Sequence, residues 1–191
     1  VSGNLPSGAL VQSATLVIDV VQEPRDGGEA SAFGLHRMLL SWGEGDKVPS
    51  PFSPGIGEPA TLGEATWTHR FAFTPQTWSA PGGAPGVDYV ADASGSQWIY
   101  SVGDSPYSFE SMPALVADVQ RWLDQPQANF GWMLISQSEG ISGTARGFGS
   151  REAIGPPRLE LEFTPVPEPQ TCFLLGVAAL AFLARHRLRT R

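Results

Sequence analysis

The sequence contains little basic charge and almost no cysteine. Lys47 is the single lysine in 191 residues and the formal net charge is −7, so the chain lacks the basic surface that nucleic-acid binding requires. Cys172 is the single cysteine, which excludes a disulfide within the chain. The fold must therefore depend on a hydrophobic core, and nucleic acid is excluded as a partner.

Apolar residues are numerous enough to form such a core. They make up 41% of the chain, with six tryptophans and ten phenylalanines, whereas disordered chains are poor in aromatic residues. The 22 glycines and 17 prolines indicate many turns. These values favour one globular domain of ordinary size with an appended segment.

Several short segments have the pattern of β-strands. Residues 158–163 alternate apolar with charged side chains, and residues 14–22 alternate around one strongly apolar face. Other apolar and aromatic segments lie between Gly/Pro clusters, and we expect further strands over 33–42, 66–73, 132–136 and 144–148.

One segment has the spacing of a helix. Residues 113–123 repeat apolar side chains at helical intervals, and Ser111 is available as a cap. Residues 43–65 and 74–97 are rich in glycine and proline and are expected to form long loops. The sequence therefore predicts an all-β fold over residues 1–163, a jelly-roll-like antiparallel β-sandwich with one short helix.

The C-terminal end has a different composition. Residues 164–169 carry alternate prolines, typical of an extended linker, residues 170–185 are almost entirely apolar, and residues 186–191 are basic. The uncharged run, 172–184, would span about 20 Å as a helix, against about 30 Å of bilayer hydrocarbon. It is either a buried helix of the domain or a short membrane helix. The flanking prolines and arginines favour a single hydrophobic membrane helix with a cytoplasmic C-terminus.

Three features follow one another at the C-terminus: Val166-Pro167-Glu168-Pro169, the apolar run and the arginine-rich end. Their order resembles the PEP-CTERM sorting signal of exported bacterial proteins. In that family an exosortase-type enzyme recognises the tail, a temporary anchor in the inner membrane, and cleaves it. The resemblance implies an exported protein that ends at the cell surface or outside the cell. The recognition residues that it implies are Pro167, Glu168, Pro169, Arg185, Arg187 and Arg189.

A series of short motifs runs in order through the body of the chain. They lie at residues 13–16, 35–37 with 42–44, 65–67, 118–123, 129–132, 148–152 and 157–159. Together they resemble a DNRLRE domain, which implies a jelly-roll-like β-sandwich on an exported protein, related in some members to carbohydrate-binding modules. The opening segment and RFD-like motif of that family are absent, so we expect the first strands and the signal peptide to be missing from this chain.

No constellation of catalytic residues is evident. No serine lies in a nucleophile elbow, and the three histidines have no further His or Cys at ligand spacing. Acidic residues such as Glu44 and Asp46 could form an acid/base pair or bind Ca²⁺, or they could belong to a solvated acidic surface. Glu44 and Glu152 follow the DNRLRE-like motifs and are also expected to pair with Arg37 or Arg151 at strand ends. We predict no catalytic residue, no metal and no cofactor.

Tryptophans are better candidates for ligand contact, because sugar rings stack on exposed aromatic rings. Trp78 and Trp98 lie in or beside the predicted loop 74–97. They are either carbohydrate-binding residues or a cover for the end of the sandwich. The other tryptophans fall in predicted strands or the helix, where core packing explains them: Trp42, Trp67, Trp122 and Trp132.

These observations favour a non-catalytic surface or matrix protein that associates with extracellular polysaccharide. One alternative is a purely structural spacer or adhesin that contacts other proteins. Another is a polysaccharide-active enzyme, which would need a cleft with paired carboxylates.

Overall fold

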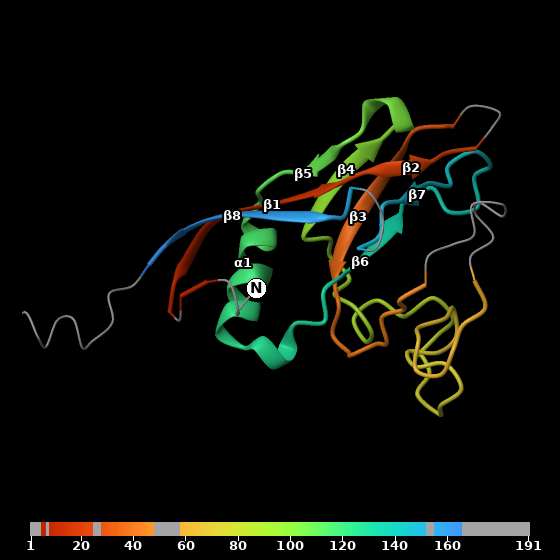
Figure 1. The fold of residues 1–191 in the computed structure, drawn as a ribbon, viewed down its shortest axis with the longest axis horizontal. Helices are drawn as coiled ribbons and strands as arrows, with labels where there is room; N and C mark the ends of the chain where they lie inside the picture. Colours follow the sequence, from red (N-terminus) through yellow and green to blue (C-terminus); the bar gives the residue numbers. More distant parts are fainter. Residues whose placement is uncertain (1–4, 7, 25–27, 48–57, 152–154, 166–191) are drawn as a thin grey trace, which may run out of the picture.

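The computed structural model consists mainly of short antiparallel strands with one α-helix (Figure 1). It describes residues 5–6, 8–24, 28–47, 58–151 and 155–165. One sheet has the order β5 (Tyr107–Phe109), β1 (Leu10–Ile18), β8 (Arg158–Thr164), and another has the order β4 (Gly95–Ile99), β3 (Ser31–Arg37), β6 (Trp132–Ser136). Strands β2 (Val20–Gln22) and β7 (Gly147–Phe148) form a third pair. The remaining elements are α1 (Pro113–Asp124) and the 3-10 turns η1 (Val102–Asp104) and η2 (Pro126–Ala128).

The predicted all-β class with one helix is confirmed, because every strand pair in these sheets is antiparallel. The jelly-roll arrangement stays a prediction. Among the described residues no helix is long and apolar enough to cross a membrane. The predicted linker 164–169 begins at the last residue of β8, and the predicted helix 170–185 and tail 186–191 lie outside the described residues.

The hydrophobic core lies between β1, the β4-β3-β6 sheet and α1. Ala14 of β1, Phe33 of β3, Ile99 of β4 and Val119 of α1 are all buried in one cluster. Figure 1 shows α1 lying against the sheet that contains β1 and β8. Each large apolar side chain buried in this way contributes about 1.5–3 kcal/mol, so the helix is held mainly by its apolar face.

Helix α1 follows the sequence prediction closely, extending one residue beyond 113–123. Pro113 occupies the first turn, where a missing backbone donor costs nothing. The N-cap is Met112, without a side-chain hydrogen bond. Ser111 does not cap the helix, because its hydroxyl accepts a hydrogen bond from the backbone N–H of Ala14, at 3.0 Å. This contact joins the start of α1 to β1.

Most of the other predicted strands form with shifted ends. The segment 132–136 is β6, 158–163 lies within β8, and 14–22 is divided between β1 and β2. Strand β3 begins two residues before the predicted segment 33–42 and ends at Arg37, and 144–148 is reduced to β7. Strands β4 and β5 were not predicted, and β4 begins inside a segment that we expected to be a loop.

The strand predicted over 66–73 is wrong. The backbone N–H of Thr66 donates to the carbonyl of His69 at 2.8 Å, and that of Ala72 donates to Glu64 at 2.6 Å. Such short-range bonds fold the segment into a compact loop, with one isolated antiparallel bridge at His69. A strand pairing would have needed those backbone groups for a neighbouring strand.

Arg146 joins three separate segments through their backbone carbonyls. Its guanidinium donates to the carbonyl of Tyr100 from Nε and Nη2, at 3.0 and 2.6 Å, and to Glu29 from Nη2 at 2.8 Å. It also donates from Nη1 to Gly143 and Ala145, at 3.0 and 2.8 Å. The fixed fork of five donors in arginine suits this arrangement, whereas lysine has one compact ammonium.

We expect Arg146→Lys to reduce the free energy of unfolding by about 1–3 kcal/mol, because carbonyls now bonded to the guanidinium would lose their partner. Urea denaturation followed by circular dichroism measures this loss. Arg121→Lys is the matched control, since Arg121 is exposed on α1. Equal stability of the two variants would contradict the prediction.

Candidate functional site

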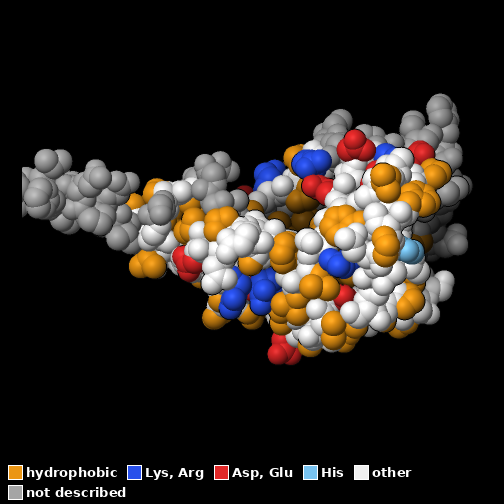
Figure 2. Space-filling view, turned by 90° about the horizontal axis from the view of Figure 1, so that it is seen from below, with side chains coloured by type: hydrophobic (Ala, Val, Ile, Leu, Met, Phe, Trp, Pro, Cys, Tyr) orange, Lys and Arg blue, Asp and Glu red, His pale blue; other side chains and the backbone are white. Residues whose placement is uncertain are grey.

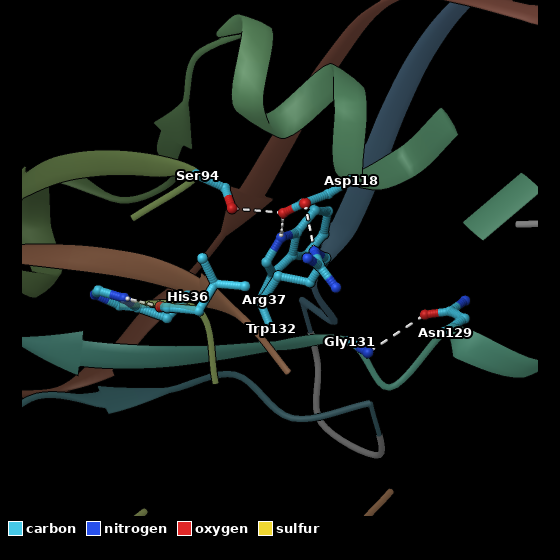
Figure 3. A network of polar contacts seen from close by, with 8 residues as sticks. His36, Arg37, Ser94, Asp118, Asn129, Gly131 and Trp132 are labelled. Carbon is cyan, nitrogen blue, oxygen red and sulfur yellow. Dashed lines mark hydrogen bonds and ion pairs between the residues drawn. The ribbon is translucent and has the colours of Figure 1, made fainter. Parts of the chain in front are cut away.

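A buried polar network joins α1 to the β4-β3-β6 sheet (Figure 3). Asp118 is 8% exposed and lies 2.8 Å from Nε of Arg37. Its Oδ2 accepts hydrogen bonds from Ser94 Oγ at 2.5 Å and from Trp132 Nε1 at 2.8 Å. Arg37 therefore pairs with Asp118 and not with Glu44. Because the three donors lie in or directly beside strands of the sheet, their bonds to Asp118 hold the helix on the sheet.

A long irregular loop, residues 58–92, lies beyond the ends of β3 and β6 (Figure 1). Asp88 is fully buried inside it. Its Oδ2 accepts from the backbone N–H groups of Ser79 and Ala84, at 3.0 and 2.7 Å, and its Oδ1 accepts from the Ser79 hydroxyl at 3.1 Å. These bonds hold the loop in one shape without regular secondary structure.

An open groove of about 650 Å³ lies between this loop and strand β6. Figure 2 views the molecule from below Figure 1 and shows hydrophobic side chains spread over its right-hand end, with charged side chains of both signs among them. Trp67 stands at the groove with 66% of its surface exposed. The main lining residues are Trp67, Trp78, Tyr89, Met133, Ile135 and Glu139.

A second hollow, of about 410 Å³, is bordered by charged side chains. Arg151 Nη1 lies 2.9 Å from Glu44 Oε2, which confirms the predicted pairing of Glu44 with Arg151. Lys47 Nζ lies 2.7 Å from Glu64 Oε2. This hydrogen bond, followed by one from a backbone N–H, lowers the pKa of Glu64 below its ordinary value of 4.5. A carboxyl with a lowered pKa is a poor general acid near neutral pH.

The two tryptophans predicted to bind carbohydrate differ in their exposure to solvent. Trp78 is 8% exposed, and its Nε1 donates to the carbonyl of Thr66 at 2.8 Å. The expectation of an exposed Trp78 ring is therefore wrong, because the loop folds over it. Trp98 is 54% exposed on β4, outside the two hollows described above. Its role in carbohydrate binding stays a prediction.

The four tryptophans that we assigned to core packing also differ in burial. Trp122 is 2% exposed and its ring centroid lies 4.3 Å from that of half-buried Trp132. Trp67 and Trp42 are 66% and 36% exposed, so their assignment to the core is wrong. The predicted strand around Trp67 does not form, and its ring rests instead against Gly82. The Pro-Gly-Gly turn was visible in the sequence, but its contact with Trp67 was not.

The two histidines that the structure describes, His36 and His69, each make a hydrogen bond within the protein. His36 Nδ1 lies 3.0 Å from the carbonyl of Val90, and His69 Nδ1 lies 2.8 Å from Oγ1 of Thr68. Within the described ranges no three His, Cys, Asp or Glu side chains gather in a way that could hold a metal ion. The sequence-based expectations of no metal, no cofactor and no catalytic residue stay predictions.

Comparison with protein families finds one motif, the PEP-CTERM protein-sorting motif, at residues 165–188. This span includes Pro167, Glu168, Pro169, Arg185 and Arg187 and ends just before Arg189. The match supports the predicted exported protein that is sorted by an exosortase. It does not extend into the β-rich body, so the resemblance to a DNRLRE domain stays a prediction. No curated protein and no solved structure matches the chain.

Proposed function

We propose that this chain is a non-catalytic surface or matrix protein whose β-rich body, similar to a DNRLRE domain, associates with extracellular polysaccharide. The observation that carries the exported, surface part of the proposal is the PEP-CTERM motif at residues 165–188. It implies an exosortase as the processing partner. The apolar run within the motif would anchor the chain in the inner membrane until cleavage, with the basic end in the cytoplasm.

The environment of the acidic residues supports a non-catalytic body. Asp118 and Asp88 are buried and bonded to donors within the fold. Glu44 and Glu64 border the second hollow and form ion pairs there. Glycoside hydrolysis needs two carboxyl groups facing one open cleft, one of them a general acid with a raised pKa. Glu44 and Glu64 share the second hollow, but each is paired with a cation and the pKa of Glu64 is lowered, which disfavours that role.

A binding assay separates this proposal from its alternatives. We expect the purified chain to be retained on insoluble or gel polysaccharide without releasing reducing sugar. A structural spacer or adhesin would not be retained, and a polysaccharide-active enzyme would release reducing ends. Either of these results would overturn the association with polysaccharide or its non-catalytic nature.

The sorting signal gives a second prediction. In a cell that expresses an exosortase, combined Pro167→Ala and Glu168→Ala should leave the protein uncleaved in the membrane fraction, because the recognition element is removed. Immunoblots of membrane and released fractions measure the ratio. Glu160→Ala is the matched control, since it removes a carboxylate from an exposed position on β8. Unchanged release of the double variant would refute the role of these residues.

A further inference from the structure

The ring of Trp67 is exposed but firmly supported. Its backbone carbonyl accepts a hydrogen bond from the N–H of Gly82 at 2.7 Å. A Cβ atom on Gly82 would lie 2.3 Å from Cη2 of the indole, so the ring rests directly on this glycine, whose φ is +82°. An aromatic side chain that is two-thirds exposed and yet held in place is typical of a binding surface and not of a core.

Tyr89 gives the groove a second fixed aromatic ring. It packs edge-on against the ring of His36, with centroids 5.4 Å apart, and its backbone forms an isolated bridge with Met38, the residue after β3. Gly83 lies beside this ring, since a Cβ atom there would be 3.3 Å from Cε1 of Tyr89. The two neighbouring glycines therefore allow Trp67 and Tyr89 to approach the same turn.

Two polar side chains, those of Tyr89 and Glu139, line the same groove. Within the described part of the chain, neither the Tyr89 hydroxyl nor the Glu139 carboxylate has a hydrogen-bond partner. Met133 and Ile135 of β6 add apolar surface to the groove. A pyranose ring has the matching chemistry, with an apolar C–H face and hydroxyl groups around its edge.

The charge of the groove favours neutral sugars over acidic ones. Glu139 is the charged residue among those that line it, and the whole chain carries a net charge of −7. Uronic-acid or sulfated polysaccharides would meet repulsion from both.

We propose that the groove between the loop 58–92 and β6 binds a neutral polysaccharide, with one hexopyranose unit stacked on Trp67 and its hydroxyls bonded to Tyr89 and Glu139. This assignment rests on the proposed association with polysaccharide. It assigns stacking to Trp67, a ring that the sequence assigned to the core, because Trp98 lies outside the groove and Trp78, which lines it, is only 8% exposed.

Affinity electrophoresis tests the assignment with the full chain. Native gels would contain a neutral glucan, such as hydroxyethylcellulose, laminarin or dextran, or an acidic polymer, alginate or polygalacturonate. We expect the wild type to be retarded by a neutral glucan and not by the acidic polymers. Trp67→Ala should weaken retardation about tenfold, the equivalent of about 1.4 kcal/mol. Trp67→Phe should restore part of it, because an aromatic face remains.

Trp98→Ala is the matched control, since Trp98 is 54% exposed outside the groove. It should bind like the wild type, and both alanine variants should keep the wild-type melting temperature. Tyr89→Phe, which removes the hydroxyl alone, gives an independent reduction if Trp67→Ala unfolds. If Trp98→Ala loses binding while Trp67→Ala and Tyr89→Phe still bind, the assignment of the site to the groove is wrong. The proposed association with polysaccharide would then still stand. Failure of the wild type to bind any of the polymers would overturn both.

Discussion

Replacing Asp118 with alanine is expected to reduce the free energy of unfolding by about 3–5 kcal/mol. The carboxylate is 8% exposed and accepts from Arg37, Ser94 and Trp132. Its removal leaves the Arg37 guanidinium, whose side chain is 17% exposed, without its ionic partner. Since the free energy of unfolding of a small domain is about 5–15 kcal/mol, this single change removes a large part of it. Urea denaturation followed by circular dichroism measures it.

Two comparisons make the effect of Asp118→Ala specific to the buried pair. Asp124→Ala removes a carboxylate from the same helix, where it is exposed and bonded to Gln120 Nε2 at 2.9 Å, and should cost well under 1 kcal/mol. Arg37→Met should cost less than Asp118→Ala, because Asp118 would retain its Ser94 and Trp132 donors. Similar losses in Asp118→Ala and Asp124→Ala would show that the network contributes little.

The elements with strong local periodicity were predictable from the sequence. Helix α1 has apolar residues at helical spacing and Pro113 in its first turn, so local chemistry alone locates it. Strand β8 alternates apolar and charged residues and lies where expected. By contrast, β5 is three residues long, too short to show a period. Its pairing with β1 is a long-range contact that periodicity does not report.

Prediction failed where tertiary contacts decide the conformation. The segment 66–73 has the aromatic and β-branched composition of a strand, but its backbone bonds are satisfied within the loop that Asp88 organises. The exposure of each tryptophan then depends on that loop. Trp78 is covered by it and Trp67 stands on Gly82. The composition indicated that aromatic side chains are the candidates for ligand contact. Which of these rings is exposed to solvent depends on the fold.

The C-terminal signal was predictable for a different reason. It is defined by the order of short features along the chain and needs no tertiary contact. The match at residues 165–188 begins where β8 ends, one residue after Thr164. Strand β8 pairs with β1 over most of its length. The sorting signal therefore follows directly from a strand that is paired into the sheet.

Trp122→Ala is expected to cost about 3–5 kcal/mol, the range for a buried aromatic side chain. Trp122 is 2% exposed and packs against Trp132 with ring centroids 4.3 Å apart. Its loss opens a cavity between α1 and the core, and it removes the ring that supports the indole bonded to Asp118. Chemical denaturation monitored by circular dichroism, which does not depend on tryptophan emission, measures the change.

Trp122→Phe separates the packing of this ring from its polar atom. The indole Nε1 of Trp122 is buried and has no hydrogen-bond partner among the described residues, a condition that costs about 1–3 kcal/mol. Phenylalanine lacks this N–H and keeps a ring in the cavity, so Trp122→Phe should cost less than half of what Trp122→Ala costs. Trp98→Ala, on an exposed face of β4, should change stability by about 0.5 kcal/mol or less. If Trp122→Phe is as unstable as Trp122→Ala, the full volume of the indole decides stability at this position. The removal of the unbonded N–H would then give no measurable compensation.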